Sequence, residues 1–76
     1  MSIDDIRELN DAVPFQPYEI HRADGRIAAV AHPDFVAFSP TGRFVVVVSP
    51  DNHVQTISVS HIVDLHHAAA DETAEH

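Results

Sequence analysis

The sequence feature that most constrains the fold is an unbroken apolar run made of Phe44, Val45, Val46, Val47 and Val48. A turn signal containing proline and glycine precedes the run at residues 40–43, and a Pro-Asp-Asn signal follows it at residues 50–52. A half-exposed strand alternates apolar and polar residues, so an unbroken β-branched row is typical of a strand that is covered on both faces. Each face of this strand therefore needs a cover, either from the same chain or from another copy.

The chain is short, so few elements could provide that cover. Its 76 residues correspond to one small domain with a modest core. It contains no cysteine, which excludes disulfides, thiolate metal sites and a cysteine nucleophile. No stretch is long and apolar enough to span a membrane, and the acidic N-terminus differs from a signal peptide. We therefore expect a cytoplasmic protein without a membrane partner or a cofactor.

The charge balance argues against polyanionic partners. The chain has 12 acidic residues against 4 arginines and no lysine, for a formal net charge of −8. Proteins that bind nucleic acid normally carry a basic patch that neutralises phosphates. Nonspecific binding to nucleic acid or to an anionic membrane is therefore disfavoured, although a ring of copies would gather its few arginines in one place.

The N-terminus predicts a short amphipathic helix. Ser2 is a good N-cap, and Asp5 stands three residues later, where a capping box places its acidic partner. Ile3, Ile6 and Leu9 recur at helical spacing and form one apolar stripe. We expect the helix to end near Asn10, because a proline follows at position 14 and restricts the residue before it.

The next segment predicts a β-hairpin around Asp24 and Gly25. Residues 18–22 form its first strand. A two-residue turn would place Ile20 opposite Ala29, whereas a three-residue turn with a glycine bulge would place Ile20 opposite Ala28. The second register also pairs Tyr18 with Val30 and keeps the apolar side chains on one face, so we favour it.

The rest of the chain predicts further short strands at residues 35–38, 44–48, 53–59 and 63–65, with a tight corner at residues 60–62. Frequent turn signals between short strands are typical of a small antiparallel barrel or rolled sheet. We therefore expect a mostly β (α+β) fold, with an N-terminal helix before a five- to six-stranded antiparallel small barrel. The domain should span residues 1–66, and residues 67–76 should be a disordered acidic tail.

Three segments carry a resemblance to known proteins. They are Pro-Phe-Gln-Pro-Tyr-Glu-Ile at residues 14–20, Asp-Gly-Arg at residues 24–26, and His-Pro-Asp-Phe-Val at residues 32–36. Together they resemble a family of short bacterial proteins of unknown function, whose members share a proline-aromatic repeat, a DGR turn and an HP-acid-FV corner. The resemblance covers roughly residues 3–66 and implies no particular activity.

The layout is also remotely similar to Sm-like and SH3-like small barrels. In Sm-like proteins a short helix precedes five bent strands, a DGR-type turn joins the first two, and edge strands pair between subunits to close a ring. This resemblance implies a nucleic-acid-binding ring that gathers Arg22, Arg26 and Arg43. The Sm-like RNA signature, an aspartate-x-x-asparagine loop, is missing, because residues 34–37 stand at that place without an asparagine.

The histidines raise the possibility of a metal-binding protein. The chain has 7 of them, and His61, His66 and His67 lie close together around Asp64. Histidine with carboxylate partners is a common ligand set for zinc. Adjacent residues of a strand point to opposite faces, however, so His66 and His67 could share one metal only if the strand had already ended. We assign no metal ligand.

Two other groups suggest chemistry less strongly. Ser58, Ser60, His61 and Asp64 contain the residue types of a hydrolytic triad, but they crowd into one corner without an oxyanion hole, so we expect no enzyme and no catalytic residue. His32, Asp34 and Phe35 flank a proline. This segment is either a strand corner, with the phenylalanine anchored in the core, or a recognition loop that exposes the histidine and the aspartate.

The apolar run leads to the functional hypothesis. In one interpretation the helix stripe covers the outer face of the valine strand within the monomer. In the other, the strand and the stripe form a subunit interface, because an exposed strand of this composition would aggregate. The leading prediction is a non-enzymatic, self-associating interaction module whose interface consists of Ile3, Ile6, Leu9, Phe44, Val45, Val46, Val47 and Val48. An Sm-like nucleic-acid-binding ring and a histidine-based metal-binding protein are the alternatives.

Overall fold

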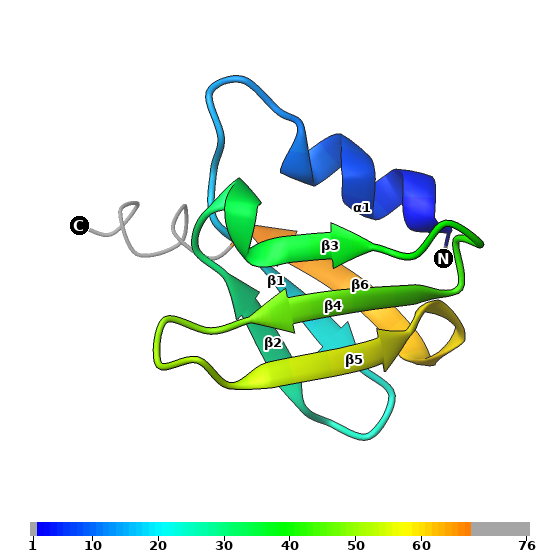
Figure 1. Ribbon diagram of the computed structural model, residues 1–76. Helices are drawn as coiled ribbons and strands as arrows, with labels where there is room; N and C mark the ends of the chain where they lie inside the picture. The colour runs from blue at the N-terminus through cyan, green and yellow to red at the C-terminus, as the bar shows by residue number, and fades with distance from the viewer. Residues whose placement is uncertain (1, 68–76) are drawn as a thin grey trace.

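The computed structural model describes residues 2–67, which form one short helix and six strands in two antiparallel sheets (Figure 1). The elements are α1 Ile3–Asn10, β1 Tyr18–Arg22, β2 Ile27–Val30, β3 Val36–Phe38, β4 Phe44–Val48, β5 Val54–Ser58 and β6 Ile62–His67, with 3-10 turns η1 Pro33–Phe35 and η2 Val59–His61. The prediction of a mostly β fold with a short N-terminal helix is confirmed.

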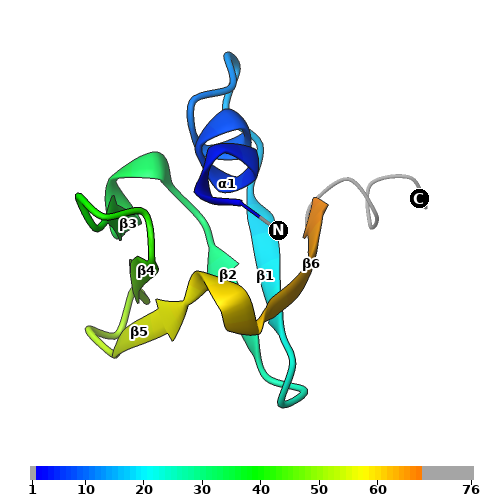
Figure 2. The same ribbon diagram turned by 90° about the vertical axis from the view of Figure 1, so that its right-hand side faces the viewer.

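The two sheets have strand orders β2-β1-β6 and β3-β4-β5. The chain passes from the first sheet to the second between β2 and β3, through η1, and returns between β5 and β6, through η2. Figure 2 shows the sheets facing each other, with α1 at one opening between them. Within residues 2–67 no ladder joins one sheet to the other, so the hydrogen bonding does not close the predicted barrel.

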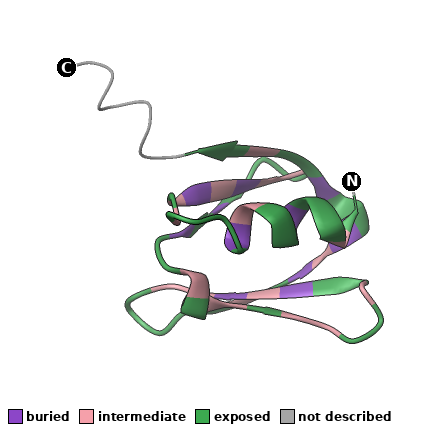
Figure 3. Ribbon diagram, turned by 90° about the horizontal axis from the view of Figure 1, so that it is seen from above, coloured by how far each residue is buried: buried purple, intermediate pink, exposed green. Residues whose placement is uncertain are grey.

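The core lies between the sheets and beneath the helix. Figure 3 shows buried positions alternating with more exposed ones along the strands. The helix contributes Ile6, which is fully buried, while Ile3 and Leu9 are partly buried against the core. The buried apolar residues are Ile6, Tyr18, Ile20, Ala28, Val30, Val45, Val47, Ile57, Val59 and Ile62. They form a single cluster to which both sheets contribute.

The apolar strand β4 has one buried face and one partly exposed face. Val45 and Val47 lie in the core at 0% and 1% exposure, whereas Val46 and Val48 are half-buried and Phe44 is 45% exposed. In one of the two interpretations of the sequence the helix stripe covers the outer face of β4, and that interpretation is wrong. Ile6 packs in the same core cluster as Val45 and Val47, so α1 closes the space between the sheets and leaves the outer face of β4 uncovered.

The β1–β2 hairpin adopts the favoured register. Tyr18 pairs with Val30 and Ile20 with Ala28, which places all four residues in the core. The turn is closed by hydrogen bonds from the Arg22 N–H to the Arg26 carbonyl at 2.9 Å and from the Gly25 N–H to the Arg22 carbonyl at 3.0 Å. Gly25 has a φ of +89°, a conformation that favours glycine, which explains this residue in the turn.

The two ends of the helix are fixed by different contacts. At the start, the Asp5 carboxylate accepts a hydrogen bond from the Ser2 N–H at 3.1 Å, as the capping pattern predicts. At the end, the buried Asn10 accepts from the Tyr18 hydroxyl at 3.0 Å and donates to the Pro33 carbonyl at 3.3 Å. Asn10 therefore connects α1, β1 and η1.

Three strands differ in their bounds from the sequence prediction. The strand expected at residues 53–59 is β5, Val54–Ser58, because Val59 belongs to η2. Phe35 belongs to η1, so β3 begins at Val36. The last strand, expected at residues 63–65, runs from Ile62 to His67, and antiparallel pairing with β1 extends it to His67, which lies opposite Tyr18. His67 was expected in the tail, and the remainder of that predicted tail lies outside the described residues.

Candidate functional site

The outer side of the β3-β4-β5 sheet carries an uncharged, largely apolar surface. On this side Val46 lies between Ala37 and Thr56, and Val48 pairs with Val54. Phe44 is 45% exposed and Val54 is 63% exposed, both high values for large apolar side chains. We call this surface the outer valine face and define it by Ala37, Phe44, Val46, Val48, Val54 and Thr56. None of these six residues is charged, in a chain of net charge −8.

The structure divides the predicted interface residues into two groups. Ile6, Val45 and Val47 are buried in the core of the single chain, at no more than 1% exposure, and present no surface to a partner. Their burial follows from the pleat, which sends alternate residues of β4 to opposite sides. Phe44, Val46 and Val48 belong to the outer valine face. Ile3 and Leu9 are half-buried against the core, at the helix, and do not belong to this face.

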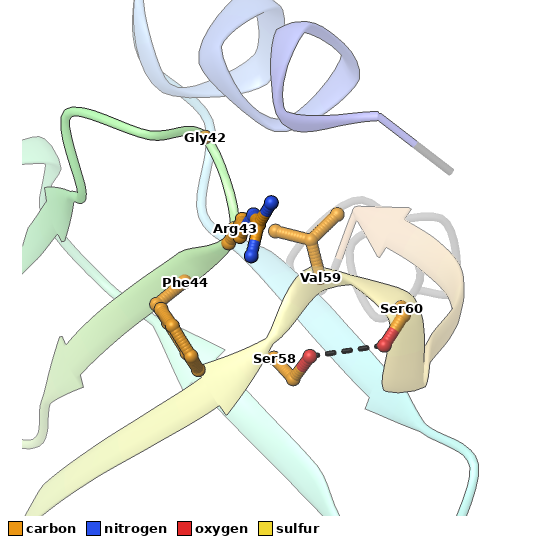
Figure 4. A pocket seen from close by; sticks show the side chains of 6 residues that line it. All are labelled: Gly42, Arg43, Phe44, Ser58, Val59 and Ser60. Carbon is orange, nitrogen blue, oxygen red and sulfur yellow. Dashed lines mark hydrogen bonds between the residues drawn. The ribbon is translucent and has the colours of Figure 1, made fainter.

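A shallow depression adjoins the outer valine face at the start of β4. It has a volume of about 520 Å³ and is lined by Gly42, Arg43, Phe44, Ser58, Val59 and Ser60. Figure 4 shows that one wall comes from the β3–β4 turn and the start of β4, and the other from the end of β5 and η2. The Ser58 and Ser60 hydroxyls lie 3.0 Å apart and share a hydrogen bond.

The walls of this depression are held together by the backbone. The Val59 N–H donates to the Arg43 carbonyl at 2.8 Å. The Ser39 hydroxyl accepts from the Arg43 and Phe44 N–H groups at 3.2 and 3.0 Å, which fixes the turn before β4. Gly42 has a φ of +75°, and a Cβ at this position would lie 3.5 Å from the Ile3 side chain. The Arg43 backbone is therefore fixed while its side chain is exposed.

Two of the three arginines assigned to a nucleic-acid site already have carboxylate neighbours. The Arg22 side chain is only 17% exposed, donates to the Gln55 side chain at 3.2 Å and lies 3.7 Å from the Asp24 carboxylate. Arg26 is exposed and lies 3.8 Å from the same carboxylate. A backbone hydrogen bond from Arg26, and then the two guanidinium groups, lower the pKa of Asp24. Within residues 2–67, Arg43 has no such carboxylate partner.

The His32–Phe35 corner combines features of both sequence interpretations. His32 caps η1 by accepting the Asp34 N–H at its Nδ1 atom, at 3.2 Å. Its ring lies 5.6 Å from the Phe35 ring and 6.4 Å from the Phe15 ring, measured between centroids. Phe35 is half-buried, while the side chains of His32 and Asp34 are 57% and 86% exposed. The corner is thus locally anchored and still presents two polar side chains to solvent.

Several histidines pair with carboxylates along the strands. His21 lies 3.0 Å from Glu19, and His66 lies 2.8 Å from Asp64. The two imidazole rings stack across β1 and β6 at a centroid distance of 4.3 Å. Hydrogen bonds from His66 and from the Leu65 backbone lower the pKa of Asp64. In the part of the chain that the structure describes, no three histidine or carboxylate side chains are grouped so as to hold a metal ion.

The serines of the suggested triad contact each other. The hydroxyl of Ser58 is bound to that of Ser60, and the Asp64 carboxylate is bound to the ring of His66. His61 stands in η2, where its carbonyl accepts from the Ala23 N–H at 2.7 Å. The structure therefore places the predicted residues in one corner but does not arrange them as nucleophile, base and orienting acid.

Sequence reasoning named Phe44, Val46 and Val48 of the outer valine face, but it missed the rest of that face and the depression at Arg43. The unbroken valine run has no alternation, so it could not show which residues face outward. The depression at Arg43 combines residues 42–44 with residues 58–60, which are distant in sequence. The only local signal for it was the turn before β4, which places an arginine beside a phenylalanine.

No helix within residues 2–67 is long and apolar enough to cross a bilayer. A comparison of the chain with protein-family models, with curated proteins and with solved structures finds no match.

Proposed function

We propose that this chain is a non-enzymatic protein-interaction module that self-associates through the outer valine face. The observation that carries the proposal is the exposure of Phe44 and Val54 beside half-buried Val46 and Val48, on a sheet side without a charged residue. Contiguous exposed apolar surface with a polar surround marks an interaction site more often than scattered apolar residues do. The helix, which could have covered this surface, packs elsewhere.

A second copy of the chain is the partner that the charges favour. Two copies of net charge −8 repel each other unless they meet on surfaces that carry no charge. The outer valine face is such a surface, and a two-fold axis would bring it against itself. Two sheets packed face to face would then bury Phe44, Val46, Val48 and Val54 between them.

Solution mass measured by light scattering across a range of protein concentration tests this proposal. We expect a mass above the 8.4 kDa of the single chain, approaching it only on dilution. Val54→Asp should give the monomer mass, because it places a carboxylate on the outer valine face. Val63→Asp is the matched control, since Val63 is also an exposed strand valine, 61% exposed against 63%, but lies on β6 in the other sheet.

The two variants together decide the outcome. A mass of one chain for the unmodified protein at every concentration would refute self-association. Equal effects of Val54→Asp and Val63→Asp would refute the outer valine face as the interface.

The strand succession favours a second candidate, an Sm-like ring that binds nucleic acid. If β2 and β3 are taken as two halves of one bent strand, the order β6-β1-β2/β3-β4-β5 is that of an SH3-like or Sm-like barrel. Strands β5 and β6 each pair on one side only within the described residues, so both could pair with a neighbouring copy. The net charge and the pairing of Arg22 and Arg26 with Asp24 weigh against the nucleic-acid part.

The ring hypothesis has its own test. It predicts RNA binding that is strongest at low salt and weakens as salt rises. Absence of RNA binding at low ionic strength, where electrostatic attraction is greatest, would exclude this candidate.

A further inference from the structure

We propose that the depression at Arg43 is a carboxylate-binding pocket for a ligand that carries an apolar group beside its carboxylate. Arg43, Ser58, Ser60 and the partly exposed Phe44 are among the residues that line the pocket's volume of about 520 Å³. These residues come from the start of β4 with the turn before it and from the end of β5 with η2, two segments that meet only in the folded chain (Figure 4).

The guanidinium is the group that would bind the ligand. The other three arginines have partners, because Arg22 and Arg26 neighbour Asp24 and the Arg7 guanidinium lies 4.8 Å from the centre of the Phe38 ring. Arg43 has no ion pair within residues 2–67, so its five N–H donors are available. A guanidinium presents a planar fork that matches the two oxygens of a carboxylate.

The serines add a hydrogen-bond donor. Of the Ser58 and Ser60 hydroxyls, one donates to the other across 3.0 Å. The accepting hydroxyl keeps its own hydrogen, which can be donated to a third group such as a ligand oxygen. In the single chain the Phe44 ring, 45% exposed, provides apolar contact surface beside these polar groups. Because the proposed self-association would bury the same ring, ligand binding and self-association should compete for it.

The backbone around the pocket is ordered before a ligand arrives. The Ser39 hydroxyl holds the Arg43 and Phe44 N–H groups, and the Val59 N–H to Arg43 carbonyl bond ties the two walls together. A site whose backbone is already ordered loses less entropy on binding than a loop that must fold around its ligand.

The charge of the molecule selects a carboxylate over more highly charged anions. The pocket offers a single guanidinium, which one carboxylate neutralises. A phosphate ester would bring a larger negative charge towards a chain of net charge −8 and would be repelled more strongly. The carboxylate could belong to the end of a polypeptide chain or to an acidic side chain.

NMR titration of the full ¹⁵N-labelled chain tests this pocket with small probes. N-acetylphenylalanine carries a chain-end carboxylate, and a blocked phenylalanyl-glutamate amide carries only a side-chain carboxylate. We expect saturable shifts at the amides of residues 42–44 and 58–60 with at least one of them, and the stronger binder identifies the source of the carboxylate. N-acetylphenylalanine amide, which lacks the charge, should bind about tenfold more weakly or not at all.

Two variants locate the binding. Arg43→Gln should abolish the saturable shifts, whereas Arg26→Gln, which changes an arginine that is 72% exposed on another turn, should leave them unchanged. Equal saturable shifts from the carboxylate probes and from N-acetylphenylalanine amide would overturn the proposal. Unchanged binding of the carboxylate probes by Arg43→Gln would overturn it as well. Tighter binding of phenyl phosphate than of either carboxylate would overturn the choice of ligand.

This inference goes beyond self-association and can fail separately from it. Val54→Asp should remain able to bind the carboxylate probes as a monomer, and Arg43→Gln should keep the solution mass of the unmodified chain. If the unmodified chain has the mass of a single chain but binds the probes, only the proposed interface is refuted. If it has the larger mass but neither it nor Val54→Asp binds the probes, only the proposed pocket is refuted.

Discussion

At the residue scale, the buried hydroxyl of Tyr18 links stability to alkaline pH. Tyr18 is fully buried, and its burial, with the nearby Asp11 carboxylate, raises its pKa to about 12. In the unfolded chain tyrosine ionises near pH 10. Since the folded pKa is the higher, the stability contributed is complete below about pH 10 and is lost as the pH rises towards 12. We expect the free energy of unfolding to fall by roughly 3 kcal/mol at most over this interval.

The composition makes the alkaline measurement unusually specific. The chain has one tyrosine, no lysine, no cysteine and no tryptophan, so phenolate absorbance reports Tyr18 alone. Urea unfolding at pH 9 and at pH 11.5 should show the loss in the unmodified chain and a much smaller one in Tyr18→Phe. A phenolate midpoint near pH 10 in the folded protein would contradict the proposed burial of this hydroxyl.

Asn10 carries a second prediction at the same scale. Asn10→Ala removes the acceptor of the Tyr18 hydroxyl and the donor to the Pro33 carbonyl, and it leaves one buried and one part-buried polar group without this partner. We expect the free energy of unfolding to fall by about 1–3 kcal/mol, measured by urea denaturation. Asn10→Ala should lower the free energy of unfolding by less in a Tyr18→Phe background, because the Tyr18 hydroxyl that would lose its acceptor is then absent. An equal cost in both backgrounds would mean that the Tyr18–Asn10 bond contributes little.

At the element scale, the strands that the sequence predicts best are those with local signals. The Asp24-Gly25 turn predicted the β1–β2 hairpin and left two registers, and the favoured one, which puts Tyr18, Ile20 and Val30 on a common face, is the one observed. The two faces of β4 could not be assigned in this way, since five apolar residues in a row contain no period. Asn10 was equally ambiguous, because an asparagine at the end of a helix is common whether or not it is buried.

The β4–β5 turn allows a prediction about acid stability. The Asp51 carboxylate accepts hydrogen bonds from the Ser49 hydroxyl and from His53, and these bonds lower its pKa to about 2. Because the folded pKa is the lower, the stability contributed is present above the unfolded pKa of about 3.9 and is lost as the pH falls towards 2. Asp51→Asn should therefore lower the melting temperature at pH 6 and have a smaller effect near pH 2. If Asp51→Asn lowered the melting temperature equally at pH 6 and near pH 2, the lowered pKa of Asp51 would not be the source of this stability.

At the scale of the whole molecule, charge and apolar surface act in opposite directions. The net charge of −8 opposes the approach of two copies, while burial of the outer valine face against another copy would be favourable. The sequence predicted an interface on the whole apolar run and could not show that Val45 and Val47 belong to the core instead. The fold separates the two roles by sending alternate residues of β4 to opposite sides of one sheet.

This opposition predicts how salt affects assembly. Raising the salt concentration screens the repulsion between two acidic copies without weakening apolar contact, so the fraction of the larger species should rise between low salt and about 0.5 M. Sedimentation velocity at fixed protein concentration measures this fraction, with Val54→Asp as the variant that should stay monomeric at every salt concentration. An assembly held by ion pairs would instead dissociate as salt rises, and that result would assign association to charged groups rather than to Phe44, Val46, Val48 and Val54.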